Sequence, residues 1–226
     1  MPFENIQKDV KSVAAFLRGF STTFAICISW TAVVFLDVWV LGTCCLENSP
    51  VEWLQFALVA ASSAAMASRA WRVEKGRAAF ILTAAFFLDM AIREQDALLD
   101  NLLWHGGWAW VVAAVTVTAF ALALRWRATL HDGLEEIQRS NRFLMLATGL
   151  AVILAISRIM GMKRLWAGFG CTSGIYLAKR VIEEGLELFG YMLIFAWAAP
   201  YLPLPRLVDE SSDSSRSHRS RIASRE

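Results

Sequence analysis

The chain has 226 residues, 57% of them hydrophobic, and a mean hydropathy of +0.46. Ordinary soluble domains are about 45–50% apolar, so the excess indicates either a very large core or a surface that faces lipid. The long apolar runs favour lipid as the surrounding medium. The net charge is only +2, which excludes the strongly basic balance of a nucleic-acid-binding protein, and we expect no nucleic-acid partner.

Residues 1–18 are predicted to form an amphipathic helix that precedes the membrane-spanning part. Ile6, Val10, Val13 and Leu17 recur at intervals of three or four residues, which places them on one face of a helix. A helix of this kind can lie along the headgroup layer of a bilayer. A water-exposed extension of the first membrane helix explains the pattern equally well.

Residues 19–205 contain apolar runs that predict an all-α bundle of about six transmembrane helices. A hydrocarbon core about 30 Å thick is crossed by about 20 helical residues, because each residue adds about 1.5 Å. The third run is apolar only as far as Leu88 and then becomes mixed. The expected spans are residues 19–41, 53–71, a run that begins near 78, 107–125, 143–160 and 185–202.

Two further segments do not fit a simple span. Residues 164–178 are apolar but too short to cross a bilayer, so they form either a re-entrant segment or, as we prefer, a helix packed on the bundle. Residues 206–226 are mainly Ser, Arg, Asp and His. Such a composition cannot bury apolar surface and predicts a disordered tail on the cytoplasmic side.

Lysines and arginines between the apolar runs predict the orientation. They precede the first span and lie in the loop after the second span, in the loop after the fourth span and in the tail, so both termini are expected to be cytoplasmic. One predicted outer connection departs from the rule. Either its cations pair with an acidic cluster, or the number of spans is wrong. These cations are Arg158, Lys163, Arg164, Lys179 and Arg180.

Ionisable residues near the predicted outer ends of the spans form two helical stripes. Asp89, Arg93, Asp96 and Asp100 fall within an arc of about 60° if they share one helix. A second stripe lies along the first part of the sixth span and just before it, at Arg180, Glu183, Glu187 and Tyr191. An unpaired charge facing lipid at mid-helix costs at least about 2.5–3.5 kcal/mol, so both stripes should face each other or a water-filled cleft.

These residues predict an acidic polar cavity that opens to the outside. Carboxylates are ligands of hard cations, so a divalent cation is a candidate cofactor. Crowded carboxylates also hold protons more tightly, which suits proton binding. The alternatives are Asp/Glu–Arg pairs that only fasten helices, or charges that project into water. The candidate substrate- or ion-binding residues are Asp89, Arg93, Asp96, Asp100, His105, Arg158, Glu183, Glu187 and Tyr191, and no catalytic residue or metal ligand is assigned.

The leading hypothesis for function is transport or binding of a cation or proton by a multi-pass protein of a plasma or bacterial inner membrane. Faces rich in Gly, Ala and Ser are compatible with a homodimer in the lipid bilayer. One alternative is a membrane enzyme acting on a lipid or cell-envelope intermediate, with Asp89, Asp96, His105 and Glu187 as acid–base or metal groups. Another is a non-catalytic accessory protein, and the sequence leaves enzyme activity open.

Overall fold

The computed structural model describes residues 2–43, 45, 49–169 and 173–203. All regular structure in these ranges is helical, which confirms the predicted all-α class. The tail predicted at 206–226 lies outside the described residues. The elements in chain order are α1 (Pro2–Phe35), the π-helix η1 (Leu36–Leu41), α2 (Pro50–Arg72), α3 (Arg77–Glu94), α4 (Asp96–Leu102), α5 (Gly107–Arg125), η2 (Arg127–Thr129), α6 (Leu130–Arg139), α7 (Phe143–Ala151), the π-helix η3 (Val152–Ser157), α8 (Arg158–Gly161), α9 (Lys163–Trp166), η4 (Ala167–Phe169), α10 (Ser173–Ala198) and η5 (Ala199–Tyr201).

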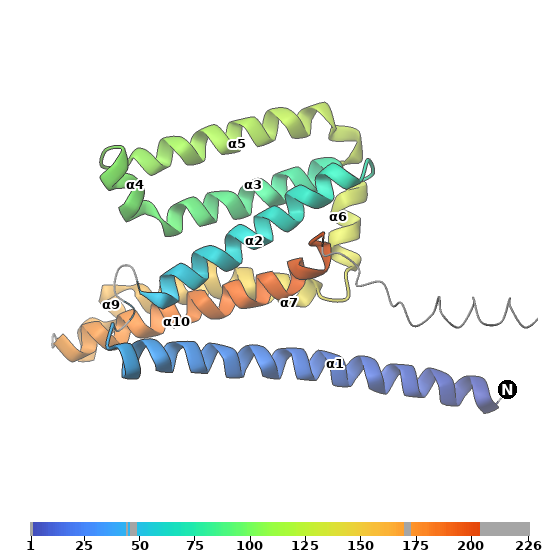
Figure 1. Ribbon diagram of the computed structural model, residues 1–226, viewed down its shortest axis with the longest axis horizontal. Helices are drawn as coiled ribbons and strands as arrows, with labels where there is room; N and C mark the ends of the chain where they lie inside the picture. Colours follow the sequence, from blue (N-terminus) through green and yellow to red (C-terminus); the bar gives the residue numbers. More distant parts are fainter. Residues whose placement is uncertain (1, 44, 46–48, 170–172, 204–226) are drawn as a thin grey trace, which may run out of the picture.

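The long helices α1, α2, α3, α5, α7 and α10 lie along one axis, and each runs opposite to the one before it (Figure 1). One end of the bundle holds α4 and α9, and we call it the α4 end. The other holds α6 and the turn between α2 and α3, and we call it the α6 end. The chain starts at the α6 end, and α10 finishes there (Figure 1). This alternation is the arrangement expected of a chain that crosses a layer repeatedly.

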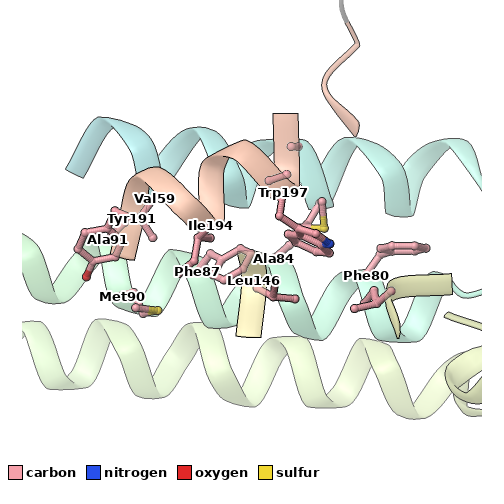
Figure 2. Close-up of a cluster of buried hydrophobic side chains, with 14 of the residues drawn as sticks. Val59, Phe80, Ala84, Phe87, Met90, Ala91, Leu146, Tyr191, Ile194 and Trp197 are labelled. Carbon is pink, nitrogen blue, oxygen red and sulfur yellow. The ribbon is translucent and has the colours of Figure 1, made fainter. Parts of the chain in front are cut away.

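The core lies where α10 packs against α2, α3 and α7 (Figure 2). Tyr191, Ile194 and Trp197 of α10 are completely buried. The indole of Trp197 meets the ring of Phe87 edge-on, with 6.3 Å between centroids. Phe80 of α3 is also buried in the same cluster. The central position of α10 explains why its polar residues, one or two turns earlier, are also held inside the protein.

Two glycines let α7 and α10 cross at close range. A Cβ atom added at Gly149 would lie 2.7 Å from the backbone oxygen of Gly190. A Cβ atom added at Gly190 would lie 2.9 Å from the oxygen of Gly149 and would overlap the side chain of Ile153. Small residues at such crossings allow helix backbones to approach closely, which is the usual way membrane helices pack.

Three helical stretches within the described residues are long and apolar enough to cross a membrane. They are Ser12–Leu41, Gly107–Arg125 and Phe143–Gly161. Only 6%, 17% and 28% of their most apolar windows are buried in the protein. Apolar helices that the protein itself leaves uncovered require an apolar surrounding medium. The chain is therefore a multi-pass membrane protein with a helical bundle.

The sequence predicted six membrane-spanning helices. Of these, α2, α3 and α10 are not among the three stretches that are long and apolar enough to cross a membrane by composition alone. Their composition gives the reason. The second predicted span is rich in Ala and Ser, whereas α3 and α10 carry several charges each. These are the helices that supply most of the core, so they face protein over much of their surface. The predicted start of the sixth span, residue 185, is also too late, because α10 begins at Ser173.

Helix boundaries decide three other predictions. The helix α1 runs through residue 18 without a break, so residues 2–18 and the first predicted span share one helix, as expected if the N-terminal segment extends the first membrane helix. The third predicted span ends at Glu94, where Gln95 leaves the α-helical region with φ −113° and ψ 27°. Asp96 and Asp100 lie on the separate helix α4. Residues 164–178 divide between α9, η4 and the start of α10, with 170–172 outside the described residues.

Candidate functional site

A polar cavity of about 190 Å³ lies at the α4 end of the bundle. Six carboxyl groups and three guanidinium groups line it, contributed by helices that are far apart in the sequence. We call this space the polar cavity. The charged residues that line it are Glu52 of α2, Arg93 and Glu94 of α3, Asp96 of α4, Arg158 of α8, and Arg180, Glu183, Glu184 and Glu187 of α10.

Glu187 is the most connected carboxylate of the polar cavity, and its residue is only 4% exposed. Its Oε1 accepts hydrogen bonds from Arg158 at 2.6 Å and from the Ser157 hydroxyl at 3.2 Å. Its Oε2 lies 3.8 Å from the guanidinium of Arg93. Because Ser157 is the last residue of the π-helix η3, that distortion ends beside the buried carboxylate. π-Helical turns occur often at functional sites.

Glu94 and Tyr191 form a second buried contact on the wall of the polar cavity. The Tyr191 hydroxyl donates to Glu94 Oε1 at 2.6 Å, and Arg93 donates to the same oxygen at 2.8 Å. Arg93 therefore lies between Glu94 and Glu187 and ties α3 to α10. Burial of a carboxylate is tolerated when it is paired and hydrogen-bonded in this way.

The rim of the polar cavity is held by contacts that α10 makes with the loop before α2. The Arg180 guanidinium donates to the backbone oxygen of Cys45 at 3.1 Å. Asp37 of η1 holds that loop in place. Its fully buried side chain accepts hydrogen bonds from the Cys45 amide at 2.6 Å and from the Thr43 hydroxyl. Lys179 pairs with Glu183 at 2.8 Å, one turn apart on α10. Asp37 thus positions the rim and does not line the cavity.

Glu184 differs electrostatically from the paired acids. Glu184 lies outside the three candidate membrane spans. The side-chain amide of Gln55 donates to the backbone oxygen of Glu184 at 2.9 Å and to its carboxylate at 3.3 Å. Burial, followed by the charge of Glu187, raises the pKa of Glu184 to about 7. This carboxyl group therefore changes charge near neutral pH.

Only part of the predicted set meets at the polar cavity. Of the nine predicted residues, the structure gathers Arg93, Asp96, Arg158, Glu183 and Glu187 at the lining and places Tyr191 against Glu94. The remaining three lie outside the cavity lining. Four further residues line the cavity but were not among the nine predicted site residues, although Arg180 was placed on the second stripe: Glu52, Glu94, Arg180 and Glu184.

Asp89, Asp100 and His105 are not part of the polar cavity. Asp89 accepts a hydrogen bond from Thr116 of α5 at 2.7 Å. Asp100 lies 3.0 Å from His105 and accepts from the Gly106 amide at 2.9 Å in the turn between α4 and α5. The sequence predicted that Asp89, Arg93, Asp96 and Asp100 lie on one face of a single helix. This prediction is wrong, because the helix ends at Gln95 and helical phase does not continue into α4. A catalytic set that joins Asp89, His105 and Glu187 therefore has no shared site.

The described residues do not offer a set of metal ligands. No group of three or more His, Cys, Asp or Glu side chains is placed to hold a metal ion in this part of the chain. Instead, Glu94, Glu183 and Glu187 each face a cationic side chain. The cavity therefore does not fit the divalent cation expected from its acidic composition.

Two of the five cations that departed from the predicted orientation have acidic partners at the α4 end. Arg158 pairs with Glu187, and Lys179 pairs with Glu183. Pairing with an acidic cluster therefore accounts for these two cations, while the described residues contain three candidate spans where the sequence predicted six. Comparison of the chain with protein-family models, curated proteins and solved structures found no match. The contacts described above are therefore the basis of any functional inference.

Proposed function

We propose that this chain is a six-span membrane protein of a plasma or bacterial inner membrane, with both termini cytoplasmic, that transports a proton or monovalent cation through an outward-facing polar cavity. The observation that carries the proposal is the excess of six carboxyl groups over three guanidinium groups in one small cavity at the end of a lipid-exposed bundle.

Exposed tryptophans support a bilayer crossing by α2, although its composition alone is not apolar enough. Trp53 lies near the start of α2 and Trp71 near its end, and the Trp71 side chain is 86% exposed. The two are separated by about 27 Å of helix. Tryptophans favour the two interfaces of a bilayer, whose hydrocarbon core has nearly this thickness. The helices α3 and α10 lie along the same axis as α2 (Figure 1). If α2 crosses the bilayer, these two helices cross it as well.

The charges on α3 and α10 are compatible with spanning helices because they face one another. Arg93 of α3 reaches Glu187 of α10, and Glu94 of α3 accepts from Tyr191 of α10. Charged groups inside membrane bundles are directed at each other or at water-filled cavities, away from lipid. The lack of high hydropathy in these two helices therefore follows from their place inside the bundle.

The distribution of cations supports the orientation. Arg72, Lys75 and Arg77 lie at the α6 end, together with Arg125 and Arg127. An excess of Lys and Arg marks the cytoplasmic side, so the α6 end is placed in the cytoplasm and the polar cavity faces outward.

A proton or monovalent cation suits the polar cavity better than a divalent ion. The carboxylates outnumber the guanidinium groups, which favours a positive ligand, but no three acidic groups converge as ligands within the described residues. A proton that binds Glu187 would weaken its contacts with Arg93 and Arg158, which come from the neighbouring elements α3 and α8. Ligand binding at Glu187 is thereby coupled to helix contacts that a transport cycle can change.

The test is ion flux in sealed liposomes that contain purified protein and a pH-sensitive dye, repeated with internal Na⁺ and K⁺ indicators. We expect Glu187→Gln to reduce flux at least tenfold per inserted molecule. Glu135→Gln is the matched control, because Glu135 forms an exposed pair with Arg139 at the α6 end. Equal flux in both variants, or no flux of any of these ions through the unmodified protein, would contradict the proposal.

A further inference from the structure

One carboxyl group stands apart from the polar cavity, at the contact between α3 and α5. Asp89 of α3 accepts a hydrogen bond on its Oδ2 from the Thr116 hydroxyl of α5, at 2.7 Å. Its other oxygen, Oδ1, is buried and has no hydrogen-bond partner among the described residues. We propose that Asp89 is a separate proton-binding site inside the bilayer, with the proton carried on Oδ1.

The contact with Thr116 sets the depth of this site. Thr116 is the tenth of the 19 residues of α5, which is one of the three candidate membrane spans. At about 1.5 Å per residue it lies about 13–14 Å from either end of the helix, near the middle of a hydrocarbon core about 30 Å thick. This depth requires α5 to cross the bilayer, and to that extent the inference rests on the proposed topology.

The Thr116 hydroxyl is directed at Asp89 instead of at its own helix. A threonine inside a helix can donate to the backbone oxygen four residues earlier, and Thr83 of α3 and Thr118 of α5 both do so. Thr116 has a single hydroxyl proton, and it donates that proton to Asp89. The helix α5 therefore supplies, at mid-depth, a polar group that serves this carboxyl group.

The charged groups of the surrounding helices are engaged elsewhere. None of the ion pairs in the part of the chain that the structure describes includes Asp89. Arg93, one turn further along α3, contacts Glu94 and Glu187. The helix α5 has its one charged residue at its end, Arg125, and the charged residues of α2 lie near its two ends. A charge without a partner is costly at the centre of a bilayer, so the neutral acid, with its proton bound, fits this position.

Reaction with a carbodiimide reports whether this carboxyl group holds a proton. The acid adds across one C=N bond, so that a carboxyl oxygen bonds to the central carbon and the proton moves to a nitrogen. The acyl group then migrates to nitrogen and gives a stable N-acylurea, which retains every atom of both reactants. An ionised carboxylate lacks the proton for this addition, and only an apolar reagent reaches the centre of a bilayer.

The test uses the full-length protein in phosphatidylcholine liposomes at about pH 7.5, treated with dicyclohexylcarbodiimide or with a charged, water-soluble carbodiimide. Peptide mass spectrometry locates the adducts. We expect dicyclohexylcarbodiimide to modify Asp89 at least tenfold more than the charged reagent does. Asp89→Asn should lose this adduct. Asp132→Asn is the matched control and should keep it, because Asp132 is exposed on α6.

The absence of an adduct at Asp89, or equal yields from the two reagents, would overturn the proton site. The outcome is separable from the proposed transport activity. Ion flux in a protein whose Asp89 does not react overturns only the proton site. An adduct at Asp89 in a protein that carries no ion overturns only the transport proposal.

Discussion

The hydroxyl of Tyr191 donates a hydrogen bond of 2.6 Å to Glu94, joining the central helix α10 to α3 at the wall of the polar cavity. Both residues are buried, and the same carboxylate oxygen also accepts from Arg93. A buried carboxylate that loses a donor pays the cost of its own desolvation. This contact therefore links the stability of the bundle to the polar groups of the cavity.

Tyr191→Phe should lower the free energy of unfolding by about 1.5–3 kcal/mol, because it removes a hydrogen bond to a charged group and leaves the ring in place. Denaturant unfolding followed by tryptophan fluorescence measures the change. Tyr176→Phe is the control, since the Tyr176 side chain is half-exposed and should be nearly neutral. Identical midpoints for Tyr191→Phe and the unmodified protein would show that the contact carries no weight.

Glu187 and Arg158 should show strong energetic coupling. Glu187→Gln leaves two guanidinium groups close together, and Arg158→Gln leaves Glu187 with the more distant Arg93 at 3.8 Å. The double variant removes both faults, so it should be more stable than the sum of the single changes predicts by about 0.5–3 kcal/mol. A double-mutant cycle measured by thermal or chemical unfolding checks this. Simple additivity would mean that the pair is not formed.

Cation binding at the polar cavity should strengthen as the pH rises from 6 to 8. The pKa of Glu184 is raised to about 7 by burial and by Glu187, with smaller contributions of the same sign from Glu94 and Glu183, while the hydrogen bond from Gln55 lowers it. Over this range Glu184 passes from roughly a tenth to nine tenths ionised, so the cavity gains negative charge. The dissociation constant of the transported cation, measured at several pH values, should fall.

Glu184→Gln should flatten that pH profile, whereas Glu135→Gln at the opposite end should leave it intact. Stability follows the opposite direction. A carboxyl group whose pKa is higher in the folded state binds more protons when folded, so its contribution to stability decreases as the pH rises from about 4.5 toward 7. A pH profile that is unchanged in Glu184→Gln would assign the titration to another group.

The crossing of α7 and α10 should not tolerate a larger residue at Gly190. Gly190→Val would place side-chain atoms against Ile153 and the Gly149 oxygen, and overpacking of this kind costs about 1–3 kcal/mol. Gly19→Ala is the control, because nothing lies within 4 Å of a Cβ atom added there. The yield of monodisperse protein after extraction and its unfolding midpoint should fall for the first variant only. Equal behaviour would place the crossing elsewhere.

Much of the architecture was predictable because apolar runs of bilayer length are a strong signal. The all-α class and the starts of α2, α3, α5 and α7 follow from such runs to within a few residues. Helical phase along α10 also predicted that Glu187 and Tyr191 share one face, because that helix is continuous from Ser173 to Ala198, and both residues are buried.

The remainder depended on contacts between distant segments. Glu94 follows Arg93 directly and lies about 100° around the helix from it, so it fell off the predicted stripe, although it contacts Tyr191 97 positions away. The break at Gln95 separated Asp96 and Asp100 from the phase of α3. Asp89 was expected near Glu187, but Thr116 of α5 is its partner. Periodicity in a single segment contains no information about which neighbour a polar face meets.

Cysteine labelling measures on which side of the membrane each end of the bundle lies. Single cysteines replace Lys163 at the α4 end or Lys75 at the α6 end, both exposed, in a background with Cys44→Ser and Cys171→Ser. Intact cells are treated with a maleimide that cannot cross membranes, and the unsubstituted background serves as the blank. We expect labelling of Lys163→Cys in intact cells and of Lys75→Cys only after permeabilisation. Labelling of both positions from the same side would contradict a bundle that spans the bilayer with its polar cavity facing outward.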